Sequence, residues 1–137
     1  MKKAKPPGHS GKIRKTEVGY EPLTFSFKHF VNHERLSPKE HPDGYAQKLA
    51  ERLRDLSRWT VAQFTQRCDH GVRNHRITWP DTSQPIGFDQ IPAQVREGEE
   101  WQFSISANEY GRVHGLLIGS VFHVVWLDCN HQLYPES

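Results

Sequence analysis

The feature that most constrains the fold of this sequence is a pair of alternating apolar segments near its C-terminus, residues 112–118 and 121–127, with only Gly119-Ser120 between them. Alternation with a period of two residues is typical of a β-strand. A two-residue connection that begins with glycine is typical of a tight hairpin turn, because glycine readily adopts the positive φ that such a turn needs. The sequence therefore predicts an antiparallel hairpin in which Ile118 lies opposite Val121.

Counting back from the turn assigns every side chain of this hairpin to one of two faces. The count places His114 opposite Val125. One face of the hairpin is then wholly apolar and is expected to lie under the helices. Its residues are Val113, Gly115, Leu117, Phe122, Val124 and Trp126. The other face carries Arg112, His114 and His123, with His123 diagonal to His114. A guanidinium and two imidazoles on one sheet surface suit a site that grips a phosphate and transfers protons. The alternative is a partly covered face whose histidines have ordinary hydrogen-bond partners.

The remaining periodicity predicts two further strands and two helices. Residues 23–28 and 101–107 alternate as half-buried strands do. Residues 46–56 place apolar side chains at helical spacing, with Asp43 as the expected N-cap, and Thr60 begins a capping-box pattern for a second helix over residues 61–67. Residues 72–79 read as a strand or extended loop, and residues 80–92 are rich in turn formers.

This order of elements predicts a single α+β domain with a mostly antiparallel sheet and two helices, both from the N-terminal half, packed on one face. The chain of 137 residues has the length of one domain. No apolar run approaches the ~20 residues of a membrane span, and no secretory signal is evident. Two cysteines do not make a disulfide framework, so a cytoplasmic protein is expected.

Charge is distributed unevenly along the chain. Six of the 18 basic residues lie in the first 15 positions, and the remaining 12 face 16 acidic residues, a net charge of −4. This excludes a uniformly basic nucleic-acid binder but not a locally basic one. Residues 1–22 are expected to form a flexible basic arm, which is either a solvated terminus or a phosphate contact, and residues 23–137 to form the domain.

Two other groups of polar residues are candidates for function, and each has a plainer explanation. A basic stretch either lines a phosphate-binding groove or solvates an edge strand: Arg67, His70, Arg73, His75 and Arg76. His131 and Tyr134 either exchange protons with a ligand or pack the C-terminus onto the sheet edge. Zinc bound by Cys68, His70, Cys129 and His131 is a further alternative, although Cys-x-His is a weak spacing.

The element order and the closing hairpin resemble the RelE/ParE-type bacterial toxins, which are small mRNA endonucleases or gyrase poisons. Residues 110–116 look like the penultimate strand of that family, which begins with an arginine. The resemblance implies that Arg112 contacts the scissile phosphate. It also implies that His131 and Tyr134 take the place of the C-terminal residues that act as general acid and base.

The expected function is therefore a toxin-like RNA endonuclease (mRNA interferase) of a bacterial toxin–antitoxin or phage-defence system, using no metal or cofactor. Its expected partners are RNA, free or on the ribosome, and a cognate antitoxin protein, with no membrane. The candidate catalytic residues are Arg112, His131, Tyr134 and His123, and the candidate RNA-binding residues are Arg67, Arg73, His75, Arg76 and His114. One alternative is a non-catalytic toxin or defence-system module that binds a protein or a nucleic acid. Another is an antitoxin or immunity protein whose acidic domain mimics or masks a nucleic-acid site.

Overall fold

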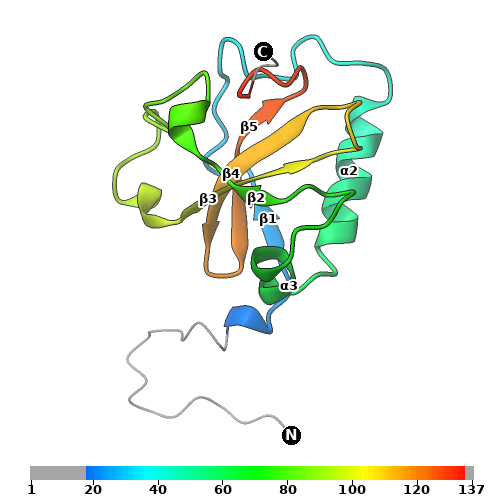
Figure 1. Ribbon diagram of the computed structural model, residues 1–137, viewed down its shortest axis with the longest axis vertical. Helices are drawn as coiled ribbons and strands as arrows, with labels where there is room; N and C mark the ends of the chain where they lie inside the picture. Colours follow the sequence, from blue (N-terminus) through cyan, green and yellow to red (C-terminus); the bar gives the residue numbers. More distant parts are fainter. Residues whose placement is uncertain (1–17, 135–137) are drawn as a thin grey trace, which may run out of the picture.

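The computed structural model describes residues 18–134, and it confirms the predicted α+β class with a mostly antiparallel sheet (Figure 1). Residues 1–17, which hold most of the expected arm, lie outside the described residues, as do residues 135–137. The strands are β1 (Thr24–Ser26), β2 (His75–Arg76), β3 (Glu99–Ser104), β4 (Arg112–Ile118) and β5 (Val121–Asp128). The helices are α2 (Tyr45–Leu56) and α3 (Val61–Gln66), with two short 3-10 turns at Trp79–Asp81 and Val95–Glu97.

The five strands form one sheet in the order β1-β5-β4-β3-β2. β1 runs parallel to β5, and the other neighbouring pairs are antiparallel. The expected extended segment over residues 72–79 contributes only the two-residue edge strand β2. The first and last strands of the sequence therefore lie side by side, while β2 lies at the opposite edge.

The two helices begin with different local devices. α3 starts at the predicted capping box, in which Thr60 accepts the Gln63 backbone N–H and the Gln63 side chain accepts the Thr60 N–H. The predicted cap of α2 is wrong by one residue, because the N-cap is Gly44 and no side chain caps it. Gly44 has a φ of 82°, a left-handed conformation that glycine adopts without a steric penalty and aspartate does not. The backbone turn therefore decides where α2 begins.

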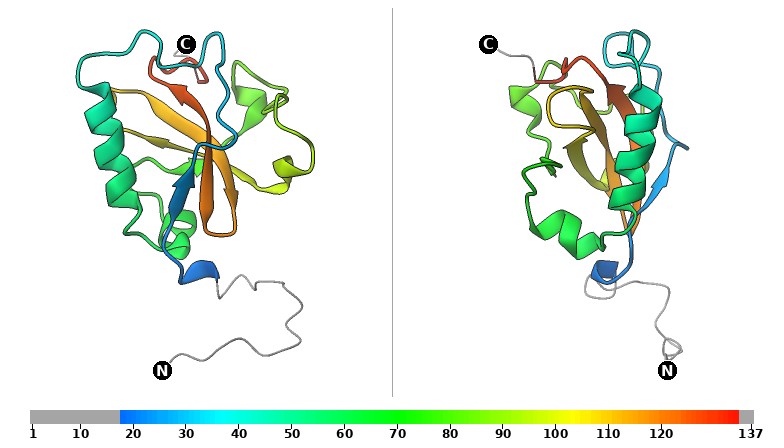
Figure 2. Two further views of the ribbon diagram at one scale, coloured as in Figure 1. Left: turned by 180° about the vertical axis from the view of Figure 1, so that it is seen from behind. Right: turned by 90° about the vertical axis from the view of Figure 1, so that its right-hand side faces the viewer.

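The larger core lies between the sheet and the two helices. It combines helix residues such as Leu56 and Phe64 with strand residues such as Phe103, Val113 and Phe122, all fully buried. Figure 2 shows α2 along this side of the sheet in both views, with α3 near the β4–β5 turn. The apolar face of the hairpin is thus covered by helices, as the sequence predicted, with one exception described below.

A second core covers the opposite face of the sheet. It contains Leu36, Ile77, Phe88, Ile91, Leu116, Val125, Trp126 and Leu133. Much of this layer comes from the turn-rich segment between β2 and β3, which lies across the sheet from α2 in Figures 1 and 2. The segment therefore makes a packed third layer, and the face that carries Arg112 and His114 is largely covered.

The β4–β5 pairing follows the prediction only near the turn. Ile118 lies opposite Val121 and Gly115 opposite Val124, as predicted. Beyond Gly115 the predicted pairing is wrong by one residue, because a β-bulge shifts the register between Gly115 and His114. His114 lies opposite Trp126, and Arg112 lies opposite Asp128.

The bulge changes which side chains reach which face. Val125 and Trp126 are both fully buried in the second core, and a bulge allows two consecutive side chains to serve one face. Trp126, expected under the helices, therefore lies beside His114, and Leu127 takes its place in the larger core. The run Val124-Val125-Trp126-Leu127 contains no polar residue that could have marked this change in the sequence.

Residues 18–22, which precede the expected start of the domain at position 23, make contacts with it. Val18 packs against the larger core, and Pro22 forms an isolated bridge with Thr60. The Val61 N–H also donates to the Glu21 carbonyl. Within residues 18–134, no helix is both long enough and apolar enough to cross a membrane.

Candidate functional site

The candidate site is built from two adjacent rows of residues on the sheet face opposite the helices. One row runs across the sheet from β2 to β5 as His75, Gln102, His114 and Trp126. The next row contains Ser104, Arg112 and Asp128. Residues opposite each other in antiparallel strands have Cβ atoms about 4.5–5.5 Å apart, so the rows bring polar groups from four strands together.

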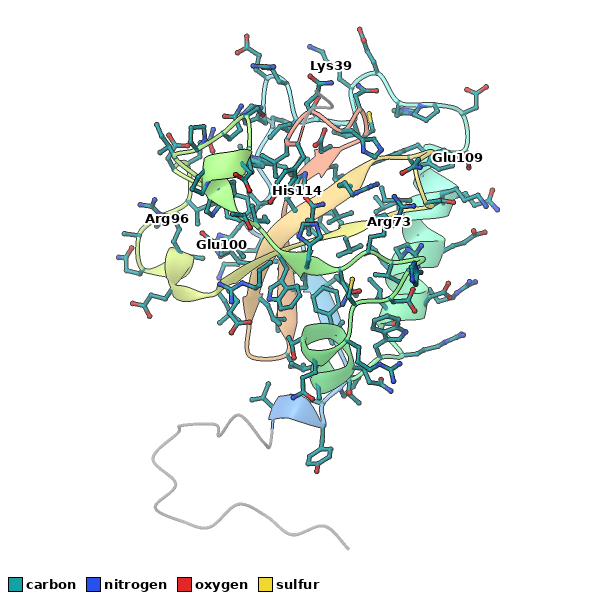
Figure 3. All side chains as sticks on the ribbon, in the orientation of Figure 1. Lys39, Arg73, Arg96, Glu100, Glu109 and His114 are labelled. Atoms are coloured by element: carbon teal, nitrogen blue, oxygen red, sulfur yellow. The ribbon has the colours of Figure 1, made fainter. Side chains whose placement is uncertain are left out.

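A pocket of about 350 Å³ opens over these rows. It is lined by His75, Gln102, Arg112, His114, Asp128, His131 and Tyr134. Five of these seven residues were singled out in the sequence, whereas Gln102 and Asp128 were not. Figure 3 shows His114 near the centre of the view, with Arg73 on the neighbouring segment that leads into β2.

The remaining predicted site residues lie elsewhere. His123 pairs with Leu116, as the hairpin count predicted, and its ring lies 5.2 Å from that of His29, but it does not line the pocket. The cause is position along the strand, because the pocket is built at the Arg112 end of β4 and His123 belongs to the end near the turn. Burial lowers the pKa of His123, and His29 and Lys28 lower it further.

Alternation along β2 separates two residues that the sequence grouped together. His75 faces the pocket, whereas Arg76 pairs with Trp101, lies over its ring at 6.0 Å and donates to the Glu100 carbonyl. Trp101 belongs to the core under the helices, so Arg76 is on the wrong face for this site. Arg67 is exposed and does not line the pocket.

Arg112 supplies the positive charge of the pocket. Its Nη1 donates to the carbonyl oxygens of Ala107 (3.0 Å) and Gly111 (3.2 Å), which fixes the guanidinium at the start of β4. Burial lowers its pKa and nearby Arg73 lowers it further, while Asp128 acts in the opposite direction. An arginine remains protonated under such shifts, so the pocket keeps a cation with a second one close by.

Arg73 itself is held by its own contact. Its Nη1 donates to Asn108 Oδ1 at 2.7 Å, across to the loop that joins β3 and β4. Arg73 does not line the pocket but lies near enough to affect Arg112. Two guanidiniums therefore lie near this side of the pocket, in a domain whose overall charge balance is acidic.

His114 and Asp128 form a fully buried pair. His114 Nε2 lies 3.1 Å from Asp128 Oδ2, and the two side chains are 0% and 1% exposed. Burial lowers the pKa of His114 by more than the contact with Asp128 raises it. For Asp128, burial acts to raise the pKa, but the hydrogen bonds from His114 and two backbone N–H groups lower it overall. The geometry is that of an imidazole donating from Nε2 to a carboxylate, and the lowered pKa of His114 favours its neutral form.

His75 is fixed on the opposite wall through Gln102. The Gln102 Nε2 amide donates to His75 Nε2 at 3.0 Å, and His75 Nδ1 lies 2.8 Å from the Arg76 carbonyl oxygen. Because a carbonyl only accepts, the proton of the neutral His75 ring is assigned to Nδ1. His75 also lies edge-on to the Tyr134 ring at 5.9 Å.

The turn after β5 brings the C-terminal residues into the pocket. Asp128 Oδ1 accepts the Gln132 N–H (2.7 Å), and Asp128 Oδ2 accepts the Leu133 N–H (2.8 Å). The Tyr134 hydroxyl accepts the Thr78 N–H at 2.7 Å, and its own proton can be donated. His131 and Tyr134 thus line the pocket on a turn that is tied down at both ends.

Backbone strain gathers around this pocket. The non-glycine residues with positive φ between positions 18 and 134 are Arg73 (54°), Ala107 (48°) and His131 (57°). Ala107 holds Arg112, Arg73 lies near Arg112, and His131 lines the pocket. Strained conformations persist where surrounding contacts enforce them, and they concentrate at functional sites.

The two residues that sequence reasoning missed could not be read from periodicity. Asp128 would lie on the helix side if the alternation of β5 were regular, and the bulge moves it to the pocket side. Gln102 reads as an ordinary polar residue of an alternating strand, yet it is only 4% exposed. The one available signal for Gln102 was that it is a polar residue in a strand that both layers cover.

The structure does not bring together the four residues that the sequence suggested as zinc ligands. Among residues 18–134, no three His, Cys, Asp or Glu side chains form a group that could hold a metal ion. Cys129 is buried with its sulfur 3.4 Å from the Ser37 carbonyl oxygen, and burial raises the pKa of its thiol. Cys68 is exposed.

The comparisons with known proteins do not identify a family for this chain. No family model matches the sequence, and no curated protein or solved structure gives a match.

Proposed function

We propose that this protein is an RNA endonuclease that cleaves by attack of a ribose 2′-hydroxyl on the adjacent phosphate. The observation that carries the proposal is the composition of the pocket. One guanidinium, one phenol and the imidazoles of His75 and His131 meet over a buried His114–Asp128 pair. A cation and side chains that can accept and donate a proton are what this reaction needs.

The reaction assigns a task to each group. His131 acts as the base and takes the 2′-hydroxyl proton as the 2′ oxygen bonds to phosphorus. Arg112 stabilises the charge on the pentavalent phosphorus, where preorganised electrostatics is usually the largest contribution. Tyr134 donates a proton to the 5′ oxygen as its bond to phosphorus breaks. The products are a 2′,3′-cyclic phosphate and a 5′-hydroxyl, so atoms and protons balance without a metal or a cofactor.

Two further features support RNA as the substrate. Arg73 lies beside Arg112, so an approaching phosphate backbone meets two cations at the pocket. The order of one strand, two helices, a short strand and three antiparallel strands is the order on which the resemblance to RelE/ParE-type toxins rests. We therefore extend the proposal to a toxin or phage-defence nuclease in the cytoplasm, acting on mRNA free or on the ribosome, with a cognate antitoxin as partner.

The test uses purified protein with RNA alone and with RNA on ribosomes, followed by analysis of the product ends. Arg112→Ala should lower cleavage by on the order of 10²-fold. His131→Ala or Tyr134→Phe should each lower it by roughly 10- to 10³-fold. Arg54→Ala is the matched control for lost positive charge, because Arg54 is an exposed residue of α2 that pairs with Asp55.

His123→Ala decides between the two placements of that residue. Because His123 is not among the residues that line the pocket, cleavage should change by less than about threefold. A loss as large as that of His131→Ala would restore the assignment made from the sequence. Cleavage that requires Mg²⁺, or that survives the Arg112, His131 and Tyr134 substitutions, would contradict the proposed site. No cleavage in either setting would favour a non-catalytic binding module.

A further inference from the structure

We propose that Asp128 is the positioning residue of this site, anchoring the turn that carries His131 and Tyr134 to the middle of the sheet through His114. The inference rests on the proposed function for what His131 and Tyr134 do. The anchor itself is a statement about the folded protein and can be tested without RNA.

The carboxylate of Asp128 joins two parts of the chain, strand β4 in the middle of the sheet and the turn after β5. From β4 it receives the Nε2–H of His114, and from the turn it receives the N–H groups of Gln132 and Leu133. Both carboxylate oxygens are used, and the side chain is 1% exposed. Hydrogen bonds to an ionised acceptor are short and strong, particularly away from water. Asp128 therefore ties the turn to the sheet, while Ser83 and Thr78 hold its far end to the segment after β2.

The turn needs such a lock because it contains a strained residue. His131 adopts a φ of 57°, which is unfavourable for a side chain with a Cβ atom. Leu133 is fully buried, its N–H is the one bound by Asp128, and its carbonyl accepts the Ser83 N–H at 2.8 Å. If the carboxylate loses its partners, the strain at His131 favours movement of the turn. The positions of His131 and Tyr134 in the pocket then change together.

In this arrangement His114 serves as a donor to Asp128 and not as an acid or base. It is fully buried, and the charged or titratable groups that face it are Asp128 on β5, Arg112 on β4 and His75 on β2. Burial, Arg112 and His75 all disfavour a second proton on the ring, and Asp128 alone favours it. His114 therefore stays neutral with its proton on Nε2. A side chain that supplies an N–H at the same place should replace it.

The test compares His114→Gln with His114→Leu. Glutamine can place an amide N–H near the position of Nε2, whereas leucine fills a similar volume with no donor. The first measurement is amide hydrogen exchange at Gln132 and Leu133, read by NMR on the protein alone. Both amides should stay protected in His114→Gln and should exchange at least about 10-fold faster in His114→Leu. Asp128→Asn should raise exchange of one of the two amides, since it removes one acceptor.

The second measurement is RNA cleavage by the same variants. His114→Gln should retain cleavage within about threefold, and His114→Leu should lose on the order of 10²-fold, as expected for a small misplacement of reacting groups. Asp89→Asn, at an exposed carboxylate outside the pocket, is the control for loss of charge. If His114→Leu does not fold, the comparison of His114→Gln with Asp128→Asn serves the same purpose.

Three results would overturn the inference. Unchanged protection of Gln132 and Leu133 in both His114→Leu and Asp128→Asn would mean that the carboxylate does not hold the turn. Intact protection with an equal loss of cleavage in His114→Gln and His114→Leu would make His114 an acid or base itself. Faster exchange with unchanged cleavage would remove the link to catalysis. A wild-type protein that cleaves no RNA contradicts the proposed function, and the exchange measurements still decide whether the anchor exists.

Discussion

Mild acid should destabilise this protein through His114 before it protonates Asp128. Burial lowers the pKa of His114 from its ordinary value of 6.5, so just below that pH the unfolded chain binds a proton that the folded protein does not. The free energy of unfolding should therefore be highest above pH 6.5 and should fall as the pH drops toward the folded-state pKa of His114. The slope for one proton is about 1.4 kcal/mol per pH unit.

Asp128 extends the same trend at lower pH. Its pKa is lowered from 3.8, because the hydrogen bonds from His114 and the turn outweigh burial. Its contribution to stability is therefore complete above pH 3.8 and is lost as the pH falls through its folded-state pKa. Between pH 6.5 and pH 3.8, a change in stability with pH therefore reports on the histidines and not on Asp128.

The assay is urea unfolding of the wild type and His114→Gln at a series of pH values from about 7.5 to about 4.5. At the high end the variant should lose only about 1 kcal/mol, since glutamine keeps a donor for Asp128. Below pH 6.5 the wild-type curve should be steeper than that of the variant by about 1.4 kcal/mol per pH unit. His123, whose pKa is also lowered, titrates in both proteins and cancels. Parallel curves would refute the neutral, buried state of His114.

Substitutions at four positions test local features of the fold by thermal or urea denaturation. Gly111→Ala should lower the free energy of unfolding by more than about 3 kcal/mol, and Gly119→Ala by about 1–2 kcal/mol. Both glycines have a positive φ, but only at Gly111 would an added Cβ collide with backbone, that of Asp128 and Cys129. Equal losses of stability in the two variants would contradict this clash. Thr60→Ala should cost about 1 kcal/mol by removing the cap of α3, and Thr60→Ser should restore most of it. Ala107→Gly should stabilise by up to about 1 kcal/mol, since it relieves a φ of 48°, and any marked loss would contradict strain there.

Local pattern was sufficient for much of the fold. The Gly119-Ser120 turn, the first four residue pairs of the hairpin and the capping box of α3 all depend on residues within a few positions of each other. The α+β class followed from the order of such elements. Four residues that line the pocket were candidates from the sequence: Arg112 as a charged residue at the start of an alternating strand, His75 as part of a basic stretch, and His131 and Tyr134 as proton-exchanging residues after the last strand.

Residues far apart in the chain decided the rest. The bulge at Val125 exists because two consecutive side chains find room in the second core, which is made by a segment that the sequence marked only as turns. That single extra residue turns Asp128 toward His114 and moves Trp126 off the helix side. Periodicity uses only the residues of one strand at a time. The face on which a side chain lies depends instead on the free energy of packing both layers of the protein against the sheet. The sequence by itself therefore determined which elements form and most of the polar residues of the pocket, and only the tertiary structure decided that a buried carboxylate would hold them together.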